Sequence, residues 1–287
     1  MRRSTSSSDT QPVSPDKSAD SRRISGGRWR RHLVAVVSCI VLLCLWQLGA
    51  MLVNAQVILP GPGPVAGSLV RIISLRPFSM NIGTTVLRAL ESFLIIVVSG
   101  LLLGVCAGVF PWVKSALNPL LTVLKATPVM SVILLAFIWF SSGTVPIFSA
   151  FLMGFPVMFI QVVQAVAQMD PALGQMCSLY GLSPSLRLKH YIVPSLLPSI
   201  VTGARLTLSM VWKVVVAAEV LTVPRYGIGS RLQMAQVNLE TSDVLAWTLI
   251  AVLLTALGDL VFDIVLAASR RISVRRARKT VPMAGGR

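Results

Sequence analysis

The longest uncharged stretch of the chain runs from residue 126 to residue 169, and its 44 residues include no Asp, Glu, Lys or Arg. A helix needs about 20 predominantly apolar residues to cross a bilayer. The stretch is therefore long enough for two membrane helices, and the Ser-Ser-Gly sequence at 141–143 provides a turn between them. We predict a tight helical hairpin whose two helices are kinked at Pro128 and Pro156.

Apolar segments of similar length occur before and after this hairpin, and only 13% of all residues are charged, against about 25% in soluble domains. This composition excludes a single soluble globular enzyme. The sequence instead predicts an all-α integral membrane protein with six transmembrane helices. The predicted spans are residues 33–53, 90–112, 118–141, 145–168, 196–222 and 244–268.

The formal net charge of +16 lies mainly in two tails. Residues 1–31 hold eight basic and three acidic side chains, and residues 270–287 hold seven basic side chains and no acidic one. Because these charges flank apolar segments and do not cover a folded face, they argue against a nucleic-acid partner. The first tail is rich in Ser, Pro and Arg, and we expect it to be disordered. The predicted organisation is a basic tail (1–31), a six-helix membrane domain (32–269) and a second basic tail (270–287).

The distribution of basic residues also predicts the orientation of the spans. If both ends of the chain are cytosolic, the cytosolic segments carry 18 Lys and Arg residues and the outer segments carry four. Cytosolic loops of membrane proteins carry an excess of Lys and Arg. We therefore expect a multi-pass protein of the plasma membrane, surrounded by lipid, with both termini in the cytosol.

Residues that could support catalysis or metal binding are scarce. The four cysteines form no Cys-x-x-Cys pair, and the only histidines are His32 and His190. We predict no catalytic residue, no metal site and no cofactor. The sequence also lacks the phosphate-binding pattern G-x-x-x-x-G-K-[ST], so any use of ATP would require a partner subunit.

The polar cytosolic segment 170–191 is long for a connection between packed helices. Asp170 is a suitable N-cap, with a proline at the first helical position after it. Gly181 can adopt the left-handed conformation that ends this helix, and the Ser-Pro pair at 183–184 can begin a second one. The segment is therefore predicted to form a helix–turn–helix elbow on the cytosolic face.

This elbow resembles the cytosolic EAA loop of ABC importer permeases, whose pattern is E-A-A-x3-G-x9-I-x-L-P. When Gly181 is placed on the motif glycine, Pro194 falls on the motif proline. Tyr191 and Val193 then stand for the Ile and the Leu. The residues at 175–177 are Gln-Met-Cys where the family has Glu-Ala-Ala.

Further segments resemble the nitrate/sulfonate/taurine-type permeases of the binding-protein-dependent transport family, over roughly residues 45–270. They are ILPGPGPV (58–65), LKATPVMSVILLAFIWF (124–140), SLYGLSPSLRLKHYIVPSLLPSIVTGARLTL (178–208), VWKVVVAAEVL (211–221) and YGIGSRL (226–232).

The resemblance implies the membrane subunit of an ATP-driven importer in a bacterial inner membrane, and not an enzyme. Two permease copies would form the path for a small, anionic solute such as nitrate, a sulfonate or taurine. A dimer of ATP-binding-cassette subunits would bind beneath them, and an extracytoplasmic binding protein would deliver the solute. The residues that the resemblance places in the ATPase-coupling loop are Gln175, Gly181, Leu182, Ser183, Arg187, Val193 and Pro194.

Charged residues inside predicted spans are candidates for the translocation path, because such residues usually face a bundle interior or a water-filled cavity. Lys213 and Glu219 are the two candidates in the fifth span. Six residues are about 600° of helix, so the two side chains do not share a face. Lys213 could attract an anionic solute, or it could extend toward the interface or pair with another helix.

Other features of the spans have structural interpretations. Arg88 and Glu91 are three residues apart and are expected to pair with each other. The glycines at 100, 104 and 108 mark a close contact between two helices. Asp259 and Asp263 share one helix face and are expected to bond either neighbouring helices or side chains in the region of Arg270.

The alternative function is an ATP-independent secondary transporter or channel. In that case Asp259 and Asp263 would form a proton relay. Such proteins are commonly built from internal repeats, and we find no convincing repeat in this chain. The elbow at 170–191 would also have no role in them.

Overall fold

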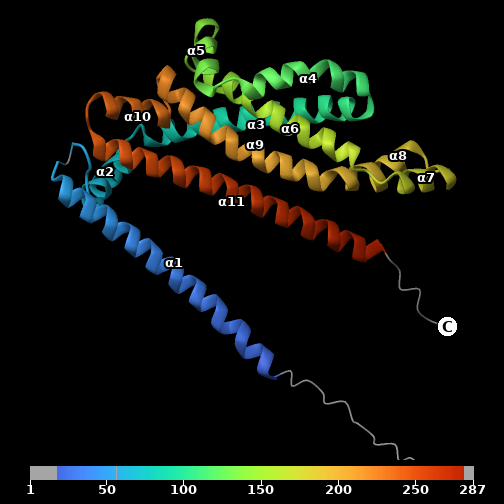
Figure 1. Ribbon diagram of the computed structural model, residues 1–287, viewed down its shortest axis with the longest axis horizontal. Coiled ribbons are helices and arrows are strands. Elements are labelled where there is room, and N and C mark those ends of the chain that lie inside the picture. Colours follow the sequence, from blue (N-terminus) through green and yellow to red (C-terminus); the bar gives the residue numbers. More distant parts are fainter. Residues whose placement is uncertain (1–17, 56, 281–287) are drawn as a thin grey trace, which may run out of the picture. The chain divides into compact units, whose positions relative to one another are not determined.

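The computed structural model describes residues 18–55 and 57–280, which form helices and turns with no strand among them (Figure 1). The predicted all-α class is confirmed. The chain divides into two units, Met1–Pro62 and Gly63–Arg287, on the basis of contacts within each.

The first unit contains one long helix, α1 (Ser18–Val53). The indole Nε1 of Trp46, within α1, donates a hydrogen bond at 3.1 Å to the carbonyl of Pro60, which lies beyond the end of the helix. Disorder was predicted over 1–31, but residues 18–31 are helical. Residues 1–17 lie outside the described residues. The physical reason is that a helix formed by the apolar span extends readily into Arg-containing sequence, since elongation costs far less than nucleation.

In the second unit, α3 (Phe78–Val109), α6 (Val145–Ala167) and α9 (Val193–Thr222) pack side by side, and α11 (Thr241–Thr280) runs along α9 (Figure 1). Short helices lie at the two ends of this bundle, with α10 at one end and α7 and α8 at the other. The remaining elements are α2 (Pro62–Ser74), α4 (Pro111–Ala126), α5 (Val129–Trp139), α7 (Pro171–Leu179), α8 (Pro184–Arg187), the π-helical turn η1 (Leu188–Ile192) and α10 (Ile228–Val237).

Five helical segments of the described residues are long and apolar enough to cross a membrane, and a sixth span results if α4 and α5 count as one. These two helices meet at an angle of 103°. The predicted span over 118–141, with a kink at Pro128, therefore consists of two separate helices. The break follows from Pro128, which has no backbone N–H and holds Thr127 in an extended conformation with ψ of 128°.

Other helix boundaries also differ from those predicted. α3 begins twelve residues before the predicted start at 90, and α11 continues through 270–280, where a separate tail was expected. Two segments expected as loops contain α2 and α10. In α2 the proline at the first position is compatible with a helix, because that N–H needs no helical partner.

The predicted contact at the glycines of α3 is confirmed, and the partner helix is α6. Gly100 lies against Met158, Gly104 against Val162 and Gly108 against Val166. A Cβ added at Gly104 would lie 2.7 Å from the Val162 Cβ. The absence of side chains on α3 is therefore what allows the two helices to approach so closely.

Gly104→Ala should destabilise the bundle by about 1–3 kcal/mol, because the added methyl group overlaps Val162 and the adjacent backbone. Gly83→Ala on the same helix is the matched control, since no atom lies within 4 Å of a Cβ there. The control should keep or raise stability by about 0.5–1 kcal/mol, as expected for Gly-to-Ala in a helix. Thermal unfolding of both purified variants measures the difference, and equal midpoints would contradict the close contact.

Candidate functional site

The elbow, residues 170–191, begins with an N-capped helix, and this helix ends at a glycine in the left-handed conformation. The Asp170 Oδ1 accepts a hydrogen bond from the Ala172 N–H at 2.8 Å, and Pro171 occupies the first turn. Gly181 has φ of +60°, and the Leu182 N–H bonds back to the Cys177 carbonyl at 3.1 Å. These contacts confirm the predicted N-cap and the predicted turn, because this closing pattern requires a residue with positive φ.

A tyrosine closes the elbow through a contact that was not predicted from the sequence. The Tyr191 hydroxyl donates a hydrogen bond to the Asp170 carbonyl at 2.7 Å, across 21 residues of chain. The ring of Tyr191 is buried and lies over Gly174, where a Cβ would be 3.3 Å from the hydroxyl oxygen. The start of α7 is thereby attached to η1, directly before α9. No periodic signal in the sequence indicates this pairing.

The elbow presents apolar side chains to the outside. Leu179 and Tyr180 are 86% and 77% exposed, and Leu173 and Met176 are also exposed. The seven predicted coupling residues are all exposed. They lie in α7 (Gln175), the turn (Gly181, Leu182, Ser183), α8 (Arg187) and the first turn of α9 (Val193, Pro194). An exposed apolar patch with a polar rim is typical of a docking surface for another protein.

At the other end of the bundle, Glu219 is fully buried in what we call the Glu219 network, formed with Thr85, Arg88 and the backbone of 226–229. The Arg88 Nη1 lies 2.6 Å from the Glu219 Oε1 and also donates to the Tyr226 carbonyl at 2.8 Å. The Thr85 hydroxyl donates to Oε2 at 2.9 Å, and the Gly229 N–H donates to the same oxygen at 3.1 Å. The buried carboxylate therefore has a charge partner and two further donors.

The backbone reaches this carboxylate because two glycines allow it. A Cβ at Gly227 would lie 2.7 Å from the Glu219 Cδ, and one at Gly229 would lie 2.6 Å from the Glu219 Cβ. The expected pair between Arg88 and Glu91 was wrong, because the guanidinium turns into the bundle toward α9 while Glu91 stays exposed. A buried carboxylate attracts the guanidinium more strongly than an exposed one, since solvent screens the exposed charge.

Lys213 and Glu219 are not brought together. Lys213 is exposed and lines a cavity of about 600 Å³ between α9 and α11, together with Trp212 and Asp259. The expected bonds of the two aspartates of α11 to a neighbouring helix are confirmed. Asp259 accepts from the Ser209 hydroxyl at 2.9 Å, and Asp263 pairs with the Arg205 guanidinium at 2.7 Å.

Glu219→Gln should lower the stability of the protein by about 3 kcal/mol, because it leaves the Arg88 guanidinium without its buried charge partner. Glu91→Gln is the control, since it removes an exposed carboxylate from the same region. The double variant Arg88→Met/Glu219→Leu should recover part of the loss, because no unpaired charge remains. Thermal unfolding measures all three variants, and an unchanged midpoint for Glu219→Gln would refute the stabilising role of the pair.

Comparison with known proteins gives relatives that are transport permeases. The chain is 27% identical to the taurine transport system permease protein TauC of Escherichia coli (strain K12), over 84% of this chain and 90% of that protein. It is 25% identical to the putative aliphatic sulfonates transport permease protein SsuC of Bacillus subtilis (strain 168), over 85% and 90%. It is 23% identical to the nitrate import permease protein NrtB of Synechococcus elongatus, over 69% and 75%.

The family model described as "Binding-protein-dependent transport system inner membrane component" matches residues 96–273, which include α6, the elbow, α9 and α10. The match covers more than half of the chain. The resemblance noted in the sequence is thereby confirmed over its most specific part, the elbow and the helix that follows it. The chain belongs to the binding-protein-dependent transport system inner membrane component family, the permeases of ABC importers.

Proposed function

We propose that two copies of this chain form the translocation path of an importer for a small anionic solute. A dimer of ATPase subunits binds the elbow, and a binding protein delivers the solute to the α10 end. In this arrangement both termini and the elbow are cytosolic, which agrees with the excess of Lys and Arg in those segments. The six-helix domain, 32–269, lies between two basic cytosolic ends.

The observation that carries the proposal is the exposed apolar face of α7, a helix that the Tyr191–Asp170 hydrogen bond holds in place. Leu173, Met176, Leu179 and Tyr180 project from a helix whose start is tied to Tyr191. The chain has no phosphate-binding loop of its own, so a partner must supply ATP hydrolysis. An apolar helix face of this kind fits into a hydrophobic groove of such a partner. Without an acidic residue at 175, docking relies on these apolar contacts.

Movement of the elbow has a direct route to the other end of the bundle. α9 starts immediately after η1 and continues for 30 residues, or about 45 Å at 1.5 Å per residue, to the Glu219 network. Closure of the ATPase dimer would push the two elbows together and shift both copies of α9. The path would then alternate between inward-facing and outward-facing states.

The solute class is proposed from Lys213 and from the relatives. TauC, SsuC and NrtB are named for transport of taurine, aliphatic sulfonates and nitrate, and each of these solutes carries an anionic group. Lys213 is exposed beside a cavity and can attract such a group. Glu219, the other candidate for the path, can contact a solute only in a state in which its network has opened.

Gly181→Val should uncouple ATP hydrolysis from the solute, because a β-branched residue is strained at φ of +60°. A Cβ at this position has no heavy atom within 4 Å, so the strain arises from the backbone conformation. Gly181→Asn is the matched control, since Asn tolerates the left-handed region. The measurement is ATPase activity of the reconstituted complex, with and without loaded binding protein.

We expect stimulation by the binding protein to fall at least several-fold in Gly181→Val and to persist in Gly181→Asn. Both variants must insert into the membrane and co-purify as folded permease for the comparison to hold. If both variants retain full stimulation, the elbow is not the coupling element. In a separate experiment, ligand mass spectrometry on the co-purified binding protein identifies the solute.

A further inference from the structure

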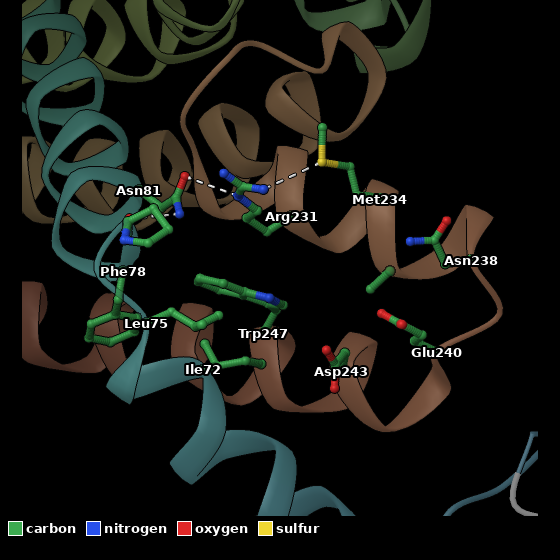
Figure 2. A pocket seen from close by; sticks show the side chains of 12 residues that line it. Ile72, Leu75, Phe78, Asn81, Arg231, Met234, Asn238, Glu240, Asp243 and Trp247 are labelled. Atoms are coloured by element: carbon green, nitrogen blue, oxygen red, sulfur yellow. Dashed lines mark hydrogen bonds between the residues drawn. The ribbon is translucent and has the colours of Figure 1, made fainter.

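At the α10 end of the bundle, a cavity of about 210 Å³ is lined by residues of α3, α10 and α11 (Figure 2). At about 30 Å³ each, this volume corresponds to about seven water molecules, or to a solute of similar size. The Glu219 network lies next to this cavity, but Thr85, Arg88 and Glu219 do not line it. The cavity brings together charged groups of both signs, and these define the chemistry of a ligand.

One wall of the cavity carries an arginine held in place without a charge partner. The Arg231 Nε donates to the Asn81 Oδ1 at 3.3 Å, and its Nη1 lies 3.6 Å from the Met234 sulfur. Asn81 is only 1% exposed, and its amide donates to the Pro77 carbonyl at 2.8 Å. The guanidinium is thus oriented by a buried amide, and its positive charge stays available.

The other arginines that cross between helices are in a different situation. In the described part of the chain, carboxylates pair with three of them: Arg71 with Asp243, Arg88 with Glu219, and Arg205 with Asp263. Arg231 faces the cavity, and its partners within the described residues are an amide oxygen and a thioether. A guanidinium with free N–H groups matches a sulfonate or carboxylate, which can accept two parallel hydrogen bonds.

The lower wall in Figure 2 carries acidic side chains. Glu240 is exposed, and among the described residues its carboxylate makes no hydrogen bond or ion pair. The nearby Asp243 is neutralised by Arg71 at 2.5 Å. The Trp247 indole lies between these groups and Arg231, with its ring centroid 6.2 Å from that of Phe78. The cavity therefore has one free positive charge, one free negative charge and an apolar floor.

We propose that this cavity binds a small zwitterion, with its acidic group on Arg231, its amine toward Glu240 and a short apolar linker over Trp247. Two separated and opposite free charges favour a ligand that is neutral overall and carries the complementary charges. A simple anion such as nitrate satisfies only the arginine. That the cavity serves as an entry site for solute rests on the proposed function, which places the α10 end outside the membrane.

The test is equilibrium binding of radiolabelled taurine to the purified full-length permease in lipid nanodiscs, without ATPase or binding protein. Ethanesulfonate, which lacks the amine, serves as the competitor. Arg231→Gln should weaken taurine binding at least about tenfold, the loss expected for one charge-assisted hydrogen bond to an anion. Arg225→Gln is the matched control, because it removes an arginine that stacks on Tyr226 and does not line the cavity.

Glu240→Gln tests the contribution of the negative charge in the cavity separately from that of Arg231. It should weaken taurine binding several-fold and leave the competing affinity of ethanesulfonate unchanged. Because Glu240 is exposed and unpaired, this variant keeps the proposal testable even if Arg231→Gln does not fold. The proposal is overturned if the wild-type permease shows no saturable taurine binding, if Arg231→Gln binds as the wild type does, or if Glu240→Gln weakens both ligands equally. None of these results would affect coupling through the elbow, so the two proposals fail separately.

Discussion

The carboxylate of Glu219 lies in a membrane helix and has no exposed surface, so its charge must be balanced inside the protein. Arg88 supplies the balancing charge, while Thr85 and the Gly229 N–H complete the hydrogen bonds. These partners come from α3 and from the segment that enters α10, so one buried group ties three elements together. The Gly227 N–H of the same segment bonds to the Asn81 Oδ1 at 3.2 Å. The network therefore also helps to orient Arg231, which Asn81 holds.

α9 runs from one end of the bundle to the other, packed beside α3 and α6. α9 begins where Tyr191 and Asp170 close the elbow and ends three residues after Glu219. Its middle packs against α6 through the core cluster that includes Met158, Val211 and Val215. α9 has packing contacts at both ends and along its length. We therefore expect it to move as a rigid body, because close-packed interiors have low compressibility and transmit strain. This arrangement suits the coupling that we propose between the elbow and the α10 end of the bundle.

Local features of the sequence predicted local structure well. Asp170, Pro171 and Gly181 act as caps in the structure because their preferences depend on their own backbone. The glycines of α3 predicted a close helix contact, although the sequence could not name α6 as the partner. The break at Pro128 was expected as a kink and became a 103° turn, since the size of a bend depends on what packs around it.

The sequence by itself determined that this chain is an all-helical membrane protein with a capped polar elbow, because apolar length, uncharged runs and backbone preferences are properties of neighbouring residues. Only the tertiary structure decided which charges meet. Arg88 was near Glu91 in sequence yet pairs with Glu219, which is 131 residues away. Likewise, Arg231 and Glu240 face one cavity only because α10 folds back against α3 and α11. Contacts of this kind depend on burial and on the competition among all available partners, which no local pattern records.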